Sequence, residues 1–186
     1  MTIGSRVLSR TTLHRGRKFD YEQLVVAGAG GQTHTRELVR HPGAVVVVPI
    51  LPDGRVVLIR VFRASIESMN LELCAGTLER GEDPAACAAR ELIEETGYRA
   101  GRIVPLGWFL TSPGLSDERM YAFAALDLEH VGQDLEEDEA IEVEIREADE
   151  VLGMICGGGF HDGKSMLALL LARRSGLMGE GGRGDA

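Results

Sequence analysis

A single helix, predicted over residues 83–96, is the feature that most constrains how this chain can fold. Pro84 suits the first helical position, where its missing N–H group would have no partner, and Asp83 favours the positive N-terminal end. Gly97 suits the position just after the last turn, and the interior consists of strong helix formers. Strand-forming segments precede and follow this helix, so we expect it to pack against a sheet.

The same helix carries Glu91, Glu94 and Glu95 at positions i, i+3 and i+4, so all three carboxylates project from one face. Like charges at this spacing destabilise a helix by about 0.2–0.5 kcal/mol per pair. A solvated helix face is the simple explanation. The alternative is a divalent cation such as Mg²⁺, which prefers carboxylate oxygens and leaves room for substrate phosphates. Arg90 lies beside the cluster and could hold a carboxylate in place.

Short apolar segments predict strands around this helix. The run at 44–51 is continuously apolar, as in a strand that is buried on both faces. A Pro-Asp-Gly turn at 52–54 and the apolar run at 55–62 predict that these two strands form a hairpin. The other strands are expected at 25–26, 33–39 (after a glycine-rich turn at 28–31), 72–74, 101–110, 120–128 and 141–145.

Two helices are expected to close the chain, over 147–155 and 162–174, the second capped by Asp162. Strands interrupted by one helix and closed by helices imply a mixed α/β sandwich. The expected divisions are an N-terminal β region over residues 1–40, a main domain over 41–178 and a disordered, glycine-rich tail over 179–186.

Composition argues against several classes of protein. Hydrophobic residues make up 44% of the chain, but no apolar run approaches the roughly 20 residues that span a bilayer. The polar N-terminal segment does not resemble a signal peptide, so we expect a cytoplasmic protein that does not associate with membranes. The net charge of −9 argues against nucleic acid as a partner. Cys74, Cys87 and Cys156 show no CxxC spacing and are expected to be buried free thiols.

The segment 76–98 resembles the Nudix box, G-x5-E-x7-R-E-U-x-E-E-x-G-U, in which U is a bulky apolar residue. Its fixed positions are filled by Gly76, Glu82, Arg90, Glu91, Leu92, Glu94, Glu95, Gly97 and Tyr98. The resemblance implies the α/β/α Nudix sandwich with a mixed sheet, and a box that binds Mg²⁺ or Mn²⁺ around a pyrophosphate. It implies that Glu91, Glu95 and the carbonyl of Ala75 are metal ligands. Glu94 and Glu95 are the catalytic candidates of the box, whereas Glu82 and Arg90 are expected to order it.

Other segments resemble the ADP-ribose pyrophosphatase subgroup. The segment 136–143 is similar to the acidic loop that supplies a metal-facing glutamate in that subgroup, so Glu139 is the candidate third carboxylate ligand and general base. A solvated loop is the alternative for this segment, and an ordinary turn is the alternative for the SPG sequence at 112–114. The segments 40–44 and 162–165 also resemble the subgroup. The candidate substrate contacts are Arg36, Arg63, Ser112 and Pro113.

The chain departs from the subgroup at a few positions. In the subgroup a glutamine usually precedes the aromatic residue and the arginine that ends this strand, but here Val61 precedes Phe62 and Arg63. The polar contacts that the glutamine would make are therefore not expected. Cys74 stands where proline is commoner. The N-terminal region of the subgroup often supplies an aromatic that stacks on adenine, for which Phe19 and Tyr21 are available.

The resemblance favours Mg²⁺-dependent hydrolysis of ADP-ribose to AMP and ribose 5-phosphate by a homodimer. The alternatives within this class are GDP-mannose, UDP-glucose or another nucleoside diphosphate sugar, followed by dinucleoside polyphosphates and capped RNA. The alternative from another class is a nucleotide-sugar sensor without catalysis. Such sensors tend to have a broken box, and the box of this chain is intact.

Overall fold

The computed structural model describes residues 4–135 and 140–179, and the chain divides into two compact units. The first unit comprises residues 1–43 together with 110–119, and the second comprises 44–109 and 120–186. A division of the chain into domains at residue 40 stays a prediction.

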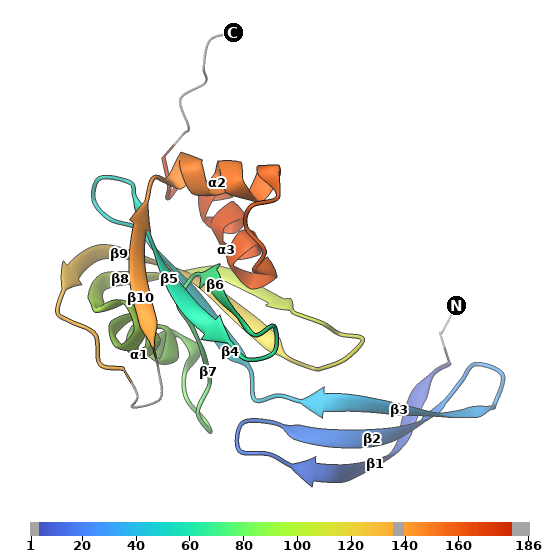
Figure 1. The fold of residues 1–186 in the computed structure, drawn as a ribbon. Coiled ribbons are helices and arrows are strands. Elements are labelled where there is room, and N and C mark those ends of the chain that lie inside the picture. The colour runs from blue at the N-terminus through green and yellow to red at the C-terminus, as the bar shows by residue number, and fades with distance from the viewer. Residues whose placement is uncertain (1–3, 136–139, 180–186) are drawn as a thin grey trace, which may run out of the picture. The chain divides into compact units, whose positions relative to one another are not determined.

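The first unit contains an antiparallel sheet with the strand order β1-β2-β3. Its strands are β1 (Arg6–Arg15), β2 (Asp20–Ala27) and β3 (Thr33–Arg40), shown in blue in Figure 1. The predicted glycine-rich turn joins β2 to β3, where the N–H group of Gly28 donates to the carbonyl of Gln32 (2.8 Å). The sequence did not predict strand β1, because all ten of its residues are exposed and no alternation of buried and exposed positions marks it.

The second unit contains a four-stranded sheet with the order β7-β4-β9-β8. Its strands are β4 (Ala44–Pro49), β7 (Ala75–Thr77), β8 (Tyr98–Leu110) and β9 (Arg119–His130). Strand β4 is parallel to β9 and antiparallel to β7, so the sheet is mixed. All six residues of β4 are buried, which confirms the prediction of a strand covered on both faces.

A second sheet of this unit has the antiparallel order β10-β5-β6, formed by β5 (Val56–Arg63), β6 (Ser68–Glu72) and β10 (Ile141–Arg146). The predicted hairpin of the strands at 44–51 and 55–62 is therefore wrong, apart from one bridge between Ile50 and Val56. The reason is that β7 and β9 already pair with β4.

The predicted strand at 72–74 is also wrong, since Glu72 ends β6 and Ala75 begins β7.

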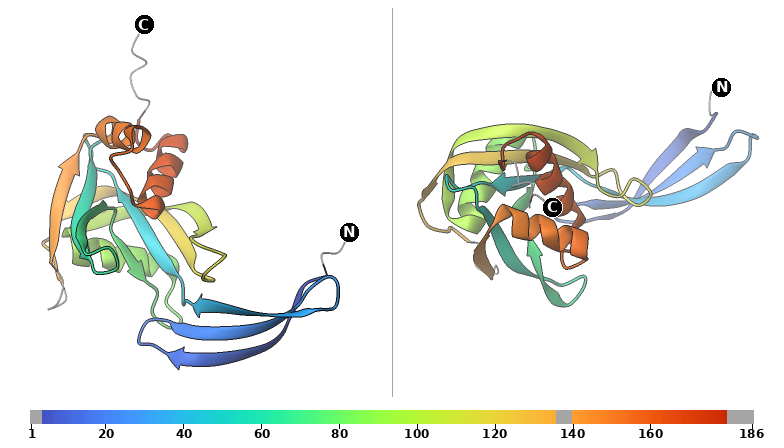
Figure 2. Two further views of the ribbon diagram at one scale, coloured as in Figure 1. Left: turned by 45° about the vertical axis from the view of Figure 1, so that its right-hand side comes forward. Right: turned by 90° about the horizontal axis from the view of Figure 1, so that it is seen from above.

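Among its described residues, the second unit also contains three helices: α1 (Pro84–Thr96), α2 (Ala148–Gly157) and α3 (Gly163–Arg174). Val46 and Val48 of β4 belong to the core that includes residues of α2 and α3, whereas Val45 and Val47 belong to the core that includes residues of α1. The sheets thus lie between α1 and the pair α2–α3, as Figures 1 and 2 show. This confirms the predicted α/β/α sandwich. Each fully buried valine contributes about 1.5 kcal/mol or more through the hydrophobic effect.

Helix α1 begins and ends as predicted. The carboxylate of Asp83 accepts hydrogen bonds from the N–H groups of Ala85 (2.9 Å) and Ala86 (3.2 Å), and Pro84 occupies the first turn. Gly97 ends the helix at φ 74°, a left-handed conformation that favours glycine. A side chain there would also lie 2.9 Å from the backbone nitrogen of Gln133. Both ends of the helix are therefore fixed by local sequence.

Two further predictions concern membranes and thiols. Within residues 4–135 and 140–179, every helix is too short or too polar to cross a bilayer. Cys74 and Cys87 are buried free thiols as predicted, and burial raises the pKa of Cys87 to about 12. The prediction is wrong for Cys156, which lies on an exposed part of α2.

Candidate active site

At the junction of α1 and β7, two of the predicted site glutamates contact neighbouring residues of β7. The carboxylate of Glu95, which is 6% exposed, accepts a hydrogen bond from the N–H group of Ala75 (2.9 Å). The carboxyl group of Glu91 lies directly against Gly76, where any side chain would overlap with it. A side chain at position 76 would therefore force the end of the Glu91 side chain to move. The two carboxylates, one helical turn apart, both lie at β7.

Arg90 holds a group of three glutamates, which we call the Arg90 cluster (Glu82, Arg90, Glu91 and Glu94). Its guanidinium donates to both carboxylate oxygens of Glu82 (3.0 and 3.2 Å), to Glu91 (2.7 Å) and to Glu94 (2.8 Å). The hydrogen bonding of Arg90 to Glu82, with a smaller contribution from the Glu79 backbone, lowers the pKa of Glu82 to about 2. The expected pairing of Arg90 with a neighbouring carboxylate is confirmed. One positive charge faces three negative charges, so the cluster is acidic as a whole.

The donor chemistry at this junction fits a hard divalent cation, because carboxylate oxygens of Glu91 and Glu95 lie together at β7. Among residues 4–135 and 140–179, no three His, Cys, Asp or Glu side chains are grouped closely enough to hold a metal. The predicted third carboxylate, Glu139, lies outside the described residues. The assignment of Ala75, Glu91 and Glu95 as ligands stays a prediction, as does the catalytic role of Glu94.

The structure contains a second charged group, which we call the Glu72 network (Arg63, Glu72, Asp162 and Lys164). The sequence did not predict it. Arg63 donates two parallel hydrogen bonds to the carboxylate of Glu72, each 2.8 Å long, and Lys164 binds both Glu72 and Asp162. Burial raises the pKa of Glu72, which is 1% exposed, but the hydrogen bonds of Arg63 and the charge of Lys164 outweigh it and lower the pKa to about 2. No local signal marked the network, because Glu72 and Lys164 are 92 residues apart in the sequence.

The predicted substrate contacts belong to different parts of the molecule. Arg63 ends β5 in the second unit, where Glu72 orients its guanidinium and its side chain is 41% exposed. Ser112 and Pro113 belong to the first unit, and the Ser112 carbonyl accepts from the N–H groups of Leu115 and Ser116, both at 2.9 Å, in a turn. Arg36 is exposed on β3 of the first unit, where it donates to the carbonyl of Thr35 (3.0 Å). All four contacts stay predictions.

The two candidate stacking aromatics lie in the first unit. Phe19 is 51% exposed and stacks on His41 with ring centroids 6.2 Å apart. Tyr21 lies on β2, and its hydroxyl group donates to Glu37 (2.5 Å). Both rings are accessible, so exposure does not distinguish them.

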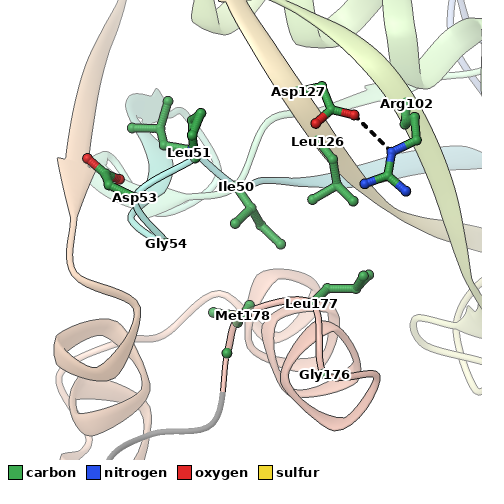
Figure 3. A pocket seen from close by; sticks show the side chains of 12 residues that line it. Ile50, Leu51, Asp53, Gly54, Arg102, Leu126, Asp127, Gly176, Leu177 and Met178 are labelled. Carbon is green, nitrogen blue, oxygen red and sulfur yellow. Dashed lines mark hydrogen bonds and ion pairs between the residues drawn. The ribbon is translucent and has the colours of Figure 1, made fainter.

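A surface pocket of about 570 Å³ lies elsewhere in the second unit (Figure 3). It is lined by Ile50, Leu51, Pro52, Asp53, Gly54, Arg102, Leu126, Asp127, Gly176, Leu177, Met178 and Gly179. It contains none of the predicted site residues. Its charged contact is an exposed ion pair between Arg102 and Asp127 (2.9 Å), so the pocket lacks the buried carboxylates that characterise the α1–β7 junction.

Comparison with known proteins places this geometry in a family. The NUDIX domain model matches residues 39–169. The chain is 32% identical to an ADP-ribose pyrophosphatase of Bacillus subtilis, covering 90% of this chain and 92% of that protein. It is also 32% identical to a GDP-mannose pyrophosphatase of Yersinia enterocolitica, covering 95% and 96%. A crystal structure described as an ADP compounds hydrolase superposes with a TM-score of 0.81 at 25% identity, covering 93% of this chain and 94% of that one. The chain therefore belongs to the Nudix hydrolase family.

Proposed function

We propose that this Nudix hydrolase cleaves the pyrophosphate bond of ADP-ribose and releases AMP and ribose 5-phosphate. The observation that carries the proposal is the meeting of Glu91 and Glu95 at β7, beside an acidic cluster ordered by Arg90. A pyrophosphate brings further negative charge to such a site, so binding requires a cation that offsets the repulsion. The family typically uses divalent metal ions, in agreement with this requirement.

In the proposed reaction, water attacks one phosphorus of the diphosphate, a new P–O bond forms and the bridging P–O bond breaks. Glu91, Glu95 and the carbonyl of Ala75 would hold Mg²⁺, or Mn²⁺ in its place. A bound metal would supply Lewis-acid activation of the phosphoryl group and of water. Glu139 would accept the proton of the attacking water, because a carboxylate within hydrogen-bond reach can serve as a general base. Glu94, held by Arg90 at 2.8 Å, would support the cluster.

Substrate binding would use cationic and turn residues. Arg63 is suited to a diphosphate, because Glu72 fixes two of its N–H groups while the side chain is still 41% exposed. Ser112, Pro113 and Arg36, all in the first unit, are the other proposed substrate contacts. We also propose a homodimer. The exposed apolar side chains of β1, Val7, Leu8 and Leu13, are between 46% and 52% exposed and would be covered by a second copy.

GDP-mannose is the second candidate substrate. It is favoured by the likeness to the Yersinia enterocolitica protein named GDP-mannose pyrophosphatase, which extends over 96% of that protein. A role as a nucleotide-sugar sensor is the candidate from another class, and the intact box argues against it.

The experiment is a panel of ADP-ribose, GDP-mannose and UDP-glucose, incubated with the protein and Mg²⁺ or Mn²⁺. Phosphatase is added afterwards, so that monophosphate products release inorganic phosphate. We expect the highest kcat/KM with ADP-ribose. If GDP-mannose is hydrolysed as well or better, the substrate assignment is wrong. If every member is bound but none is hydrolysed, the protein is a sensor.

A further inference from the structure

The start of α3 is tied to the backbone immediately before the candidate metal site. The hydroxyl oxygen of Ser165 accepts a hydrogen bond from the N–H group of Leu73 (2.8 Å), and both residues are 0% exposed. The same hydroxyl donates to the carboxylate of Asp162, which also accepts from the N–H group of Ser165 (3.1 Å). Asp162 is thus both the N-cap of α3 and the partner that orients the Ser165 hydroxyl toward Leu73.

Three consecutive residues are each held by a different element of the second unit. Leu73 is held by α3 through Ser165 (2.8 Å). Cys74 is held by β4, because its carbonyl accepts from the N–H group of Val47 (3.0 Å). Ala75 is held by α1, because its N–H group donates to Glu95 (2.9 Å). A shift at Leu73 is therefore transmitted through one intervening residue to the backbone that contacts Glu95.

We infer that Ser165 and Asp162 are positioning residues for the candidate metal site, acting through Leu73 on Ala75 and Glu95. The inference rests on the proposed function. Loss of the Ser165 hydroxyl would leave the buried N–H group of Leu73 without its acceptor, and such a group costs free energy until the backbone moves to find another. That movement displaces Ala75. Partners of metal-binding groups affect metal affinity because they fix the geometry of the ligands.

The experiment measures direct binding of Mn²⁺ to the full chain by isothermal titration calorimetry, without nucleotide, for wild type and Ser165→Ala. We expect the Kd for Mn²⁺ to rise about tenfold, as for other residues that support metal ligands. The Mg²⁺ concentration for half-maximal activity should rise in parallel, whereas the KM for ADP-ribose at saturating Mg²⁺ should change less than about twofold if ligand geometry alone is affected.

Two control variants alter the same helix but leave the hydrogen bond between Ser165 and Leu73 in place. Ala172→Gly loosens α3 at a buried position, and Ser175→Ala removes an exposed hydroxyl that donates to the carbonyl of Leu171 (2.9 Å). We expect a lower Tm for Ala172→Gly and an unchanged Kd for Mn²⁺ in both. An unchanged Kd in Ser165→Ala, or an equal loss of affinity in Ala172→Gly, would overturn the inference.

Asp162→Ala serves as the second variant if Ser165→Ala does not fold, because it removes the acceptor that orients the Ser165 hydroxyl and keeps that hydroxyl itself. Weaker Mn²⁺ binding is expected there too, and wild-type affinity would overturn the inference. If wild type binds Mn²⁺ but hydrolyses none of the nucleotide sugars, the proposed function fails while the Mn²⁺ titrations still decide the role of Ser165.

Discussion

The Arg90 cluster and the Glu72 network are both built from glutamates and basic side chains, but their charge balance differs. In the Arg90 cluster one arginine faces three glutamates, whereas in the Glu72 network two cations face two carboxylates. Glu72 is 1% exposed, and a buried charge is tolerated only where it is paired. The comparison shows that net charge matters more than the number of carboxylates. A group with excess negative charge is suited to bind a cation, whereas a group with balanced charges is suited to stabilise the fold.

The largest expected effect is a loss of catalysis when Glu95, which lies at β7 together with Glu91 of the Arg90 cluster, loses its charge. Glu95→Gln keeps an acceptor for the N–H group of Ala75 but removes the negative charge. We expect kcat to fall on the order of 10³-fold, because bound metal contributes strongly to phosphoryl transfer. Circular dichroism should show an intact fold. Glu144→Gln, in β10, is the matched control and should retain activity. Near wild-type activity in Glu95→Gln would remove Glu95 from the site.

The Glu72 network, in which the charges balance, should instead contribute to the free energy of unfolding. The folded pKa of Glu72 is about 2, below its ordinary value of 4.5, so its contribution is present above pH 4.5 and is lost as the pH falls toward 2. Glu72→Gln should lower the free energy of unfolding at pH 7 by about 3 kcal/mol, measured with denaturant. The difference from wild type should shrink between pH 5 and pH 2. A difference that is independent of pH would show that the Glu72 charge is not the source of the stability.

Gly76→Ala tests the close packing of Glu91 on β7. The added methyl group forces the Glu91 carboxyl group to move, so we expect a loss of about 1 kcal/mol of stability and a higher Mg²⁺ concentration for half-maximal activity. The matched control is Gly153→Ala in α2, where an added methyl group meets no atom within 4 Å. That variant should gain about 0.5–1 kcal/mol, because alanine favours a helix over glycine. Equal thermal stability of the two variants would contradict the packing described for Gly76.

The smallest effect is expected at the exposed ion pair in the pocket of Figure 3. Arg102 and Asp127 are each 63% exposed, and such pairs contribute little because water screens them. Arg102→Ala should change the free energy of unfolding by less than about 0.5 kcal/mol and leave kcat/KM unchanged. A large loss of activity would connect this pocket with substrate.

The elements that the sequence predicted well are those with local signals. Helix α1 has its cap, its proline and its terminal glycine within a few residues of the helix itself, so its bounds were predictable. Strand β4 was predictable because a continuous apolar run has to be buried. Strand β1 was missed because none of its ten residues is buried. The pairing of β4 with β7 and β9, in place of β5, depends on competition among distant strands that local sequence does not encode.

The same distinction holds for the site. Helical spacing alone was enough to bring Glu91, Glu94 and Glu95 to one face, and adjacency in the box indicated the pairing of Arg90. The Glu72 network was not predictable, because Glu72 and Lys164 are 92 residues apart and meet only after the sheet and α3 have packed. The tie from Ser165 to Leu73 spans the same separation of 92 residues.

The most direct measurement of the central claim is calorimetric titration of Mn²⁺ into wild type, Glu95→Gln and Glu144→Gln. The proposal places the cation site at the carboxylates of Glu91 and Glu95, and on that proposal wild type and Glu144→Gln should bind Mn²⁺ with the same Kd. Glu95→Gln should bind at least about tenfold more weakly. Equal Mn²⁺ affinity in wild type and Glu95→Gln would contradict the claim that the junction of α1 and β7 is the metal site.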